Sequence, residues 1–168
     1  MPRLVSLLLL FTTMPLFSSA TPLPVGASAP LVSAVTDTGA TLDLGTVYSE
    51  NNYTLVFFYP KADTPGCTNQ ACSLRDAYET LSDKGVAVIG VSTDSVENQR
   101  DFKAKHRLPY TLLADKDKKV MKAFGVPGLM LASRQAYLLH EGKIVYADHK
   151  GSTTKQAEDV LRFLAEQE

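Results

Sequence analysis

The stretch TLVFFYPKADTPGC at residues 54–67 decides the fold, because it joins a strand signal directly to a helix signal. Residues 54–59 form a continuous β-branched and aromatic run, which is typical of a strand buried on both faces. Pro60 ends this run, and a helical pattern extends from about Pro65 to Ser82. We therefore expect a buried strand, a short loop and a helix in direct succession.

Strands and helices alternate on both sides of this unit. Upstream, residues 31–36 and 41–44 flank the turn signal Asp37-Thr38-Gly39 and predict a hairpin. Downstream we expect strands at 86–92 and 110–114, helices at about 95–106 and 118–124, a hairpin of 135–139 with 143–147, and a terminal helix with Ala157, Val160, Leu161 and Leu164 on one face. This order predicts an α/β domain with a mixed central sheet flanked by helices.

The composition is that of one ordinary globular domain. The chain has 168 residues, of which 45% are hydrophobic, and its 17 basic residues nearly balance 18 acidic ones. No basic patch for nucleic acid or an anionic membrane stands out in the sequence. The expected partners are small molecules or other proteins.

Residues 1–20 differ in composition from the rest of the chain. Arg3 precedes the apolar run LVSLLLLF, and the segment closes with Ser18-Ser19-Ala20. This combination is typical of a secretory signal peptide, cleaved here after Ala20. The apolar run is short for a membrane span, which needs about 20 apolar residues, and an uncleaved anchor is the alternative. We expect export, to a bacterial periplasm or to the cell exterior, and one domain at residues 21–168 without membrane contact after cleavage.

Cys67 is placed where a helix can activate it. Thr64 suits the N-cap and Pro65 the first helical position, so Cys67 falls in the first turn, where unpaired N–H groups favour a thiolate. The helix end contributes only about 0.3–1 kcal/mol, and an ordinary thiol is mostly protonated near neutrality, so a cation is also needed. Arg134, at the entry to a predicted strand, is the candidate. The alternative is a small buried hydrophobic residue without chemistry.

Cys72 is predicted on the opposite side of the same helix. Cys67 shares an apolar stripe with Ala71, Leu74, Tyr78 and Leu81. Cys72 is rotated by about 140° from Cys67, on the polar face. In an intact helix the two Cα atoms lie about 8–9 Å apart, beyond the limit of about 7 Å for a disulfide. Either the helix unwinds to form the bond or the cysteines never pair, and a static structural bridge is disfavoured.

The segment FFYPKADTPGCTNQAC at residues 57–72 closely resembles the peroxiredoxins, in particular the bacterioferritin comigratory protein and peroxiredoxin Q group. The signature of that group is Pro-x-x-x-Thr-x-x-Cys with a second cysteine five residues on. The similarity extends to the lead-in Gly26-x-x-Ala29-Pro30, LRD (74–76), VIGVSTD (88–94), YTLLAD (110–115) and FGV (124–126). It covers nearly all of the chain after residue 20.

The resemblance implies a thioredoxin-like fold and a role for each matched residue. Cys67 would be the peroxidatic cysteine and Cys72 the resolving one. Thr64 would donate a hydrogen bond to the peroxide, Arg134 would place its guanidinium beside the sulfur, and Pro60 would shield the pocket. The implied partners are a hydroperoxide substrate and a thioredoxin-like dithiol reductant, with no metal or organic cofactor and a monomeric protein. The leader departs from the pattern of this group, whose members are mostly cytosolic or organellar.

Two other functions are compatible with a pair of cysteines. A general disulfide oxidoreductase of the same fold would carry Cys-x-x-Cys, which the sequence lacks. A non-enzymatic secreted module with one structural disulfide would have cysteines inert to peroxide. A zinc site has little support, because His106, His140 and His149 are scattered without ligand spacing.

Overall fold

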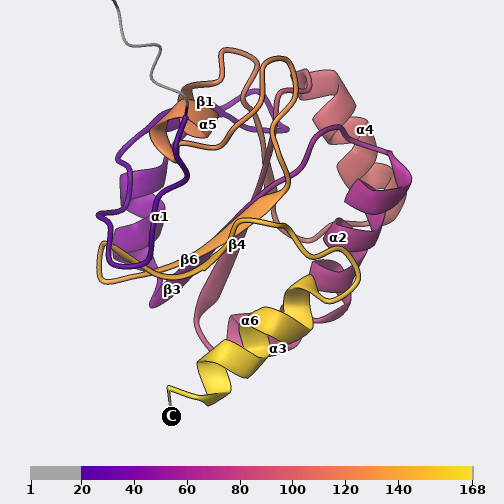
Figure 1. The fold of residues 1–168 in the computed structure, drawn as a ribbon. Coiled ribbons are helices and arrows are strands. Elements are labelled where there is room, and N and C mark those ends of the chain that lie inside the picture. Colours follow the sequence, from indigo (N-terminus) through magenta and orange to yellow (C-terminus); the bar gives the residue numbers. More distant parts are fainter. Residues whose placement is uncertain (1–19, 168) are drawn as a thin grey trace, which may run out of the picture.

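A computed structural model describes residues 20–167 (Figure 1). The predicted signal peptide, apart from Ala20, lies outside these residues, so its cleavage stays a prediction. In chain order the elements are β1 (Ser33–Val35), β2 (Thr41–Asp43), α1 (Leu44–Glu50), β3 (Tyr53–Phe58), α2 (Pro65–Asp76), α3 (Tyr78–Asp83), β4 (Val86–Ser92), α4 (Val96–His106), β5 (Thr111–Ala114), α5 (Lys119–Ala123), β6 (Gln135–His140), β7 (Lys143–Asp148) and α6 (Gln156–Ala165).

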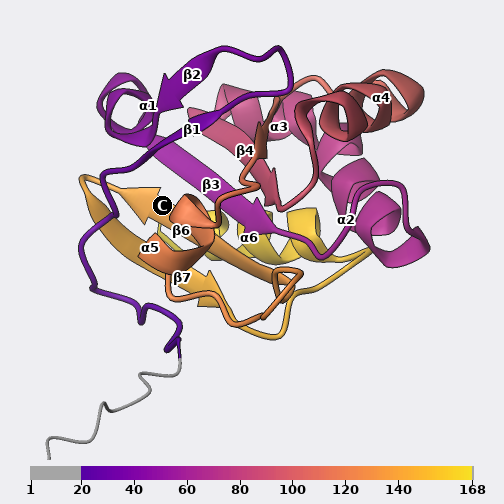
Figure 2. The ribbon, with the colours of Figure 1, turned by 90° about the horizontal axis from the view of Figure 1, so that it is seen from above.

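The central sheet has the strand order β5-β4-β3-β6-β7. Strands β3, β4 and β5 are parallel, whereas β6 runs antiparallel to both β3 and β7. Seen from above, β3 lies between β4 and β6, and the small β1–β2 hairpin lies beside α1 (Figure 2). The predicted mixed sheet and both predicted hairpins are confirmed.

Helices cover both faces of this sheet (Figure 1). Leu55 and Phe57 of β3 pack in a core with α2, α3, α4 and α6, while Val56 and Phe58 pack in a second core with α1 and α5. All four side chains are fully buried. Burial of such a side chain contributes about 1.5–3 kcal/mol, so the uninterrupted apolar run follows from a strand with a core on each side.

The helix predicted from Pro65 to Ser82 is wrong in one respect, because it is two helices. Helix α2 ends at Asp76, Ala77 has φ −98° and ψ 7°, and α3 begins at Tyr78. No glycine or proline marks the break. Leu74 and Leu81, on either side of it, are both buried in the same core, so tertiary packing can override the local preference for one helix. No helix among residues 20–167 is long and apolar enough to cross a membrane.

Candidate active site

The cysteine site lies where β3 gives way to α2. Asp63 has a left-handed backbone with φ 58°, and Thr64 then takes an extended N-cap conformation before Pro65 at the helix start. The amide of Thr68 donates to the carbonyl of Thr64 at 2.8 Å and closes the first turn. Cys67 therefore occupies the first turn, as expected, and only 1% of it is exposed.

The Thr64 side chain does not cap this helix. Its hydroxyl donates to the carbonyl oxygen of Lys61 at 2.9 Å, within the loop before α2. Thr64 is the N-cap residue, as expected, but it takes this position through its backbone conformation without a side-chain capping bond. Since the side chain leaves the first-turn N–H groups without a cap, these groups can direct their positive ends toward an anion near Cys67.

Arg134 lies beside the Cys67 sulfur. Its Nη2 is 3.4 Å from Cys67 Sγ, within hydrogen-bonding distance for sulfur. The sheet explains the contact, because Phe58 at the end of β3 is paired with Gln135 at the start of β6. Residues adjacent to these strand ends are thereby brought together. A buried thiolate needs such a cationic partner, because an unpaired charge out of water is costly.

Two glycines give the guanidinium this position. A Cβ on Gly66 would lie 3.1 Å from Arg134 Nη2, so the α2 backbone approaches the guanidinium closely. Gly151 has φ 66°, and a Cβ there would lie 2.5 Å from the carbonyl oxygen of Arg134. The connection after β7 therefore packs directly against the Arg134 backbone.

Cys72 is five residues further along α2. It is half-buried, whereas the sequence pattern predicted the polar face, and neither cysteine is in a disulfide. The hydroxyl of Tyr110 donates to the carbonyl of Ala71 at 2.8 Å, and burial raises the pKa of Tyr110 well above its usual value, so this anchor stays protonated. Helix α2 is continuous through both cysteines, which keeps their sulfurs apart. Pro60 follows β3 closely and is half-buried; its shielding role stays a prediction.

Comparison with known proteins identifies the family of this chain. The model of the AhpC/TSA family matches residues 25–147. The chain belongs to the AhpC/TSA family. It is 46% identical over 102 residues to the "Putative peroxiredoxin bcp" of Coxiella burnetii, covering 61% of this chain and 66% of the relative. It is 42% identical over 116 residues to "Peroxiredoxin Q, chloroplastic" of Suaeda salsa, covering 66% of this chain and 54% of that relative. The matches thus span about half to two thirds of the length of these curated relatives.

A solved structure similar to this AhpC/TSA chain is the peroxidoxin BcpB of Mycobacterium tuberculosis. Its TM-score is 0.79 at 30% identity, and the match covers 84% of this chain and 96% of that one. The thioredoxin-like fold is therefore confirmed, as is the resemblance to the bacterioferritin comigratory protein and peroxiredoxin Q group.

In this AhpC/TSA family member the loop before α2 is held to α4. The carboxylate of Asp63 accepts from Lys105 Nζ at 2.6 Å and is 2.9 Å from His106 Nε2. Hydrogen bonding to His106, and then to Lys105, lowers the pKa of Asp63 below its usual value. The amide of Ala62 donates to Asp94 at 2.8 Å, which adds a second tether.

Sequence reasoning missed two glutamines behind the arginine. Arg134 Nη1 donates to Gln70 Oε1 at 2.7 Å, and Gln70 Nε2 donates to Gln156 Oε1 at 2.9 Å. Gln70 follows Cys67 by three positions on the same helix, so its proximity to the site could have been inferred. Gln156 lies far away in sequence, in α6, and no local pattern pointed to it.

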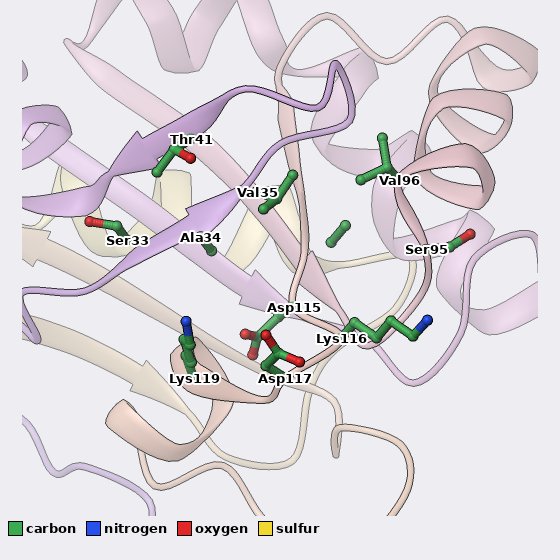
Figure 3. A pocket seen from close by; sticks show the side chains of 11 residues that line it. Ser33, Ala34, Val35, Thr41, Ser95, Val96, Asp115, Lys116, Asp117 and Lys119 are labelled. Atoms are coloured by element: carbon green, nitrogen blue, oxygen red, sulfur yellow. The ribbon is translucent and has the colours of Figure 1, made fainter.

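Neither cysteine lines the cavity that lies beside β1 and β5. A cavity of about 510 Å³ lies between β1 and the carboxyl end of β5 (Figure 3). Its lining includes Ser33, Asp115 and Lys119, and no cysteine. Within the described part of the chain, no group of three or more His, Cys, Asp or Glu side chains could hold a metal ion.

Proposed function

We propose that the protein is a thiol-dependent peroxidase that reduces hydrogen peroxide and organic hydroperoxides with Cys67. The observation that carries this proposal is the 3.4 Å contact between Arg134 Nη2 and the sulfur of a cysteine in the first turn of α2. Membership of a family whose curated relatives carry peroxiredoxin names supports it.

Two groups of the site can stabilise a negative charge on the Cys67 sulfur during the reaction. The sulfur is almost wholly removed from water, so its charged form depends on the groups that face it. The Arg134 guanidinium supplies a charge-assisted donor, and the first turn of α2 supplies the positive end of a helix. These two contributions act on the nucleophile before any substrate arrives.

The first step transfers one oxygen atom to sulfur. The Cys67 thiolate attacks the terminal oxygen of the peroxide, an S–O bond forms as the O–O bond breaks, and the leaving alkoxide or hydroxide takes a proton. The product pair is a sulfenic acid and an alcohol or water. Guanidinium and backbone N–H donors stabilise the charge that develops on the two oxygens.

Thr64 completes the peroxide site in this proposal. Its hydroxyl proton is used in the bond to Lys61, which leaves the oxygen lone pairs available. We expect this oxygen to accept a hydrogen bond from the O–H of a bound hydroperoxide. Donation by Thr64, as the family resemblance implies, requires the hydroxyl to rotate away from Lys61.

The second step regenerates a stable sulfur species. The Cys72 thiol condenses with the Cys67 sulfenic acid, which forms a disulfide and releases water. A thioredoxin-like dithiol then exchanges with this disulfide, returns both cysteines to thiols and leaves as a disulfide itself. The presence of both cysteines on one helix supports an intramolecular disulfide.

The rival functions lack such support. A general disulfide oxidoreductase would use a closely spaced pair of the Cys-x-x-Cys type, and the cysteines here are five residues apart. A binding module with a structural bridge would have its cysteines paired, and here both are free.

We also propose that the protein acts outside the cytoplasm as a monomer. The composition of residues 1–20 supports export to a periplasm, where the reductant would be an exported dithiol protein. Sedimentation of the mature protein would test the monomer directly.

Rapid mixing of the reduced protein with hydrogen peroxide and with several organic hydroperoxides tests the proposed function. We expect oxidation of Cys67 far faster than that of a free thiol, and a product whose mass is that of an intramolecular disulfide. Oxidation of the protein no faster than that of free cysteine, or a product with both thiols intact, would contradict the proposal.

A further inference from the structure

A chain of side-chain amides lies behind the guanidinium of Arg134. Gln70 and Gln156 are both 0% exposed, so no solvent competes for their hydrogen bonds. The chain runs from Cys67 Sγ through Arg134 and Gln70 to Gln156 on the C-terminal helix α6. It connects the reactive sulfur to an element that is distant in sequence.

The chemistry of these groups fixes the orientation of both amides. A guanidinium has only donors, so the atom of Gln70 that faces Arg134 has to be the oxygen. The Gln70 nitrogen then faces Gln156, and it requires an acceptor there, which is Gln156 Oε1 at 2.9 Å. If Gln156 offered no acceptor, nothing in this contact would favour the orientation of Gln70 that Arg134 needs.

Gln156 is left with an unpartnered polar atom as a consequence. Its Nε2 is buried and has no hydrogen-bond partner among the described residues. Such a buried, unpaired donor is destabilising, and an apolar side chain of the same length would avoid that cost. A glutamine here is therefore explained by its oxygen rather than by the stability of α6.

The start of α6 is fixed against α2 and the arginine. The amide of Ala157 donates to Ser73 Oγ at 3.3 Å, next to the contact of Gln156 with Gln70. Figure 1 shows the connection from β7 to α6 running beside α2. This connection includes Gly151, which packs against Arg134. Gln156 thus lies where α6 and the preceding connection pack against α2 and Arg134.

We propose that Gln156 is a positioning residue of the cysteine site. Its Oε1 holds the Gln70 carboxamide with the oxygen toward Arg134, and thereby keeps the guanidinium directed at Cys67 Sγ. The inference rests on the proposed peroxidase function. Gln156 contacts neither the sulfur nor the peroxide, so it acts only through Gln70.

A double-mutant cycle tests this role. The variants are Gln156→Met, Gln70→Met and the double variant, and the readout is the rate constant for oxidation of the reduced protein by hydrogen peroxide across a pH series. We expect Gln156→Met to slow oxidation about fivefold to tenfold and to move the rate–pH profile to higher pH. The double variant should be no slower than Gln70→Met, because the contact is already lost there.

Two further variants separate positioning from stability. Val160→Ala, a fully buried site on α6, should lower the free energy of unfolding in urea by creating a cavity, without moving the rate–pH profile. Gln156→Glu keeps an acceptor for Gln70, and the N-terminal position on α6 offsets part of the cost of burying its carboxyl group. It should oxidise within about threefold of the wild-type rate.

Several results would overturn the inference. One such result is a Gln156→Met protein that has the wild-type oxidation rate and the wild-type rate–pH profile. Another is a double variant in which the effects of the two Met substitutions on the rate multiply. If Gln156→Met does not fold, a Gln156→Glu protein that is oxidised as slowly as Gln70→Met would also overturn the inference. A wild-type protein that hydrogen peroxide does not oxidise would instead refute the proposed function.

Discussion

The guanidinium of Arg134 is a charged group in direct contact with the Cys67 sulfur. We predict that Arg134→Ala slows oxidation by hydrogen peroxide roughly tenfold or more at neutral pH. The rate–pH profile should move to higher pH, since the thiolate loses its cationic partner. Stopped-flow oxidation over a pH series measures both effects.

Arg162→Ala is the matched control for this prediction. Arg162 is on the exposed face of α6 and pairs with Asp159 at 2.8 Å, away from the sulfur. Its removal should leave the rate–pH profile of Cys67 unchanged. An unchanged profile for Arg134→Ala as well would mean that Arg134 does not stabilise the thiolate.

At the same scale, some site residues could be predicted from the sequence and others could not. Cys67 and Thr64 were placed by local rules for helix starts, which depend on neighbours in the chain. Gln156 and Gly151 act through contacts made only after β7 and α6 have packed. Periodicity carries no information on such contacts, so neither residue was recognised.

At the scale of elements, helix α2 has to open before the sulfurs can meet. A helix holds residues five apart about 8–9 Å from one another, and short segments at helix ends open at low cost in free energy. We predict that the disulfide form loses hydrogen-exchange protection from about Gly66 to Ser73.

Cys72→Ser should keep the first oxidation fast, but stop at the sulfenic acid and block turnover with a dithiol reductant.

Equal protection of these amides in the reduced and disulfide forms would contradict local unwinding. The contacts of Gln70 with Arg134 and Gln156 lie within this segment, so they would have to break as α2 opens. An oxidised protein that is a Cys67-linked dimer would contradict the intrachain disulfide itself.

The loop before α2 adds a pH-dependent contact with α4. Because hydrogen bonds from His106 and Lys105 lower the pKa of Asp63 below 3.8, its carboxylate stabilises the fold above that pH. The contribution is lost as pH falls through the lowered pKa. We predict that Asp63→Asn is less stable than wild type at neutral pH, and that the difference shrinks as pH falls below about 3.8 and disappears below the lowered pKa of Asp63.

Urea unfolding of both proteins over a pH series measures this difference. Asp83→Asn, at the exposed end of α3, serves as a control for the removal of one negative charge. A stability difference for Asp63→Asn that persists at the lowest pH would show that the ionised carboxylate of Asp63 is not its cause.

Most elements could be predicted because their signals are local. Strand β4 was expected with the same bounds as observed, since an apolar run between turn residues is unambiguous. The break between α2 and α3 was not expected, because Ala77 is a good helix former. Packing of the side chains on either side of it overrides this preference.

At the scale of the whole molecule, the order of the strands in the central sheet determines where the site lies. The antiparallel strand β6 beside the parallel pair β3 and β4 brings Arg134 to the end of β3, where Cys67 follows. Strand order depends on contacts between distant segments, so the sequence alone predicted a mixed sheet and not this order. Arg134 was a candidate from its place at the entry to a predicted strand, and the family resemblance implied its contact with the sulfur.

The leader is the remaining feature at this scale. We predict removal after Ala20, which gives a mature protein that begins at Thr21. N-terminal sequencing of protein exported by a bacterial host, together with fractionation of the cells, measures the outcome. Full-length chain in the membrane fraction would count against cleavage and export.

The most direct test of the whole account is hydrogen peroxide consumption by Cys67→Ser in the presence of a dithiol reductant, with wild type as the reference. We predict that Cys67→Ser consumes no peroxide above the reductant alone, although Cys72 is still present, because only the sulfur beside Arg134 can displace the peroxide leaving group. Substantial turnover by Cys67→Ser would contradict the assignment of Cys67 as the reactive cysteine.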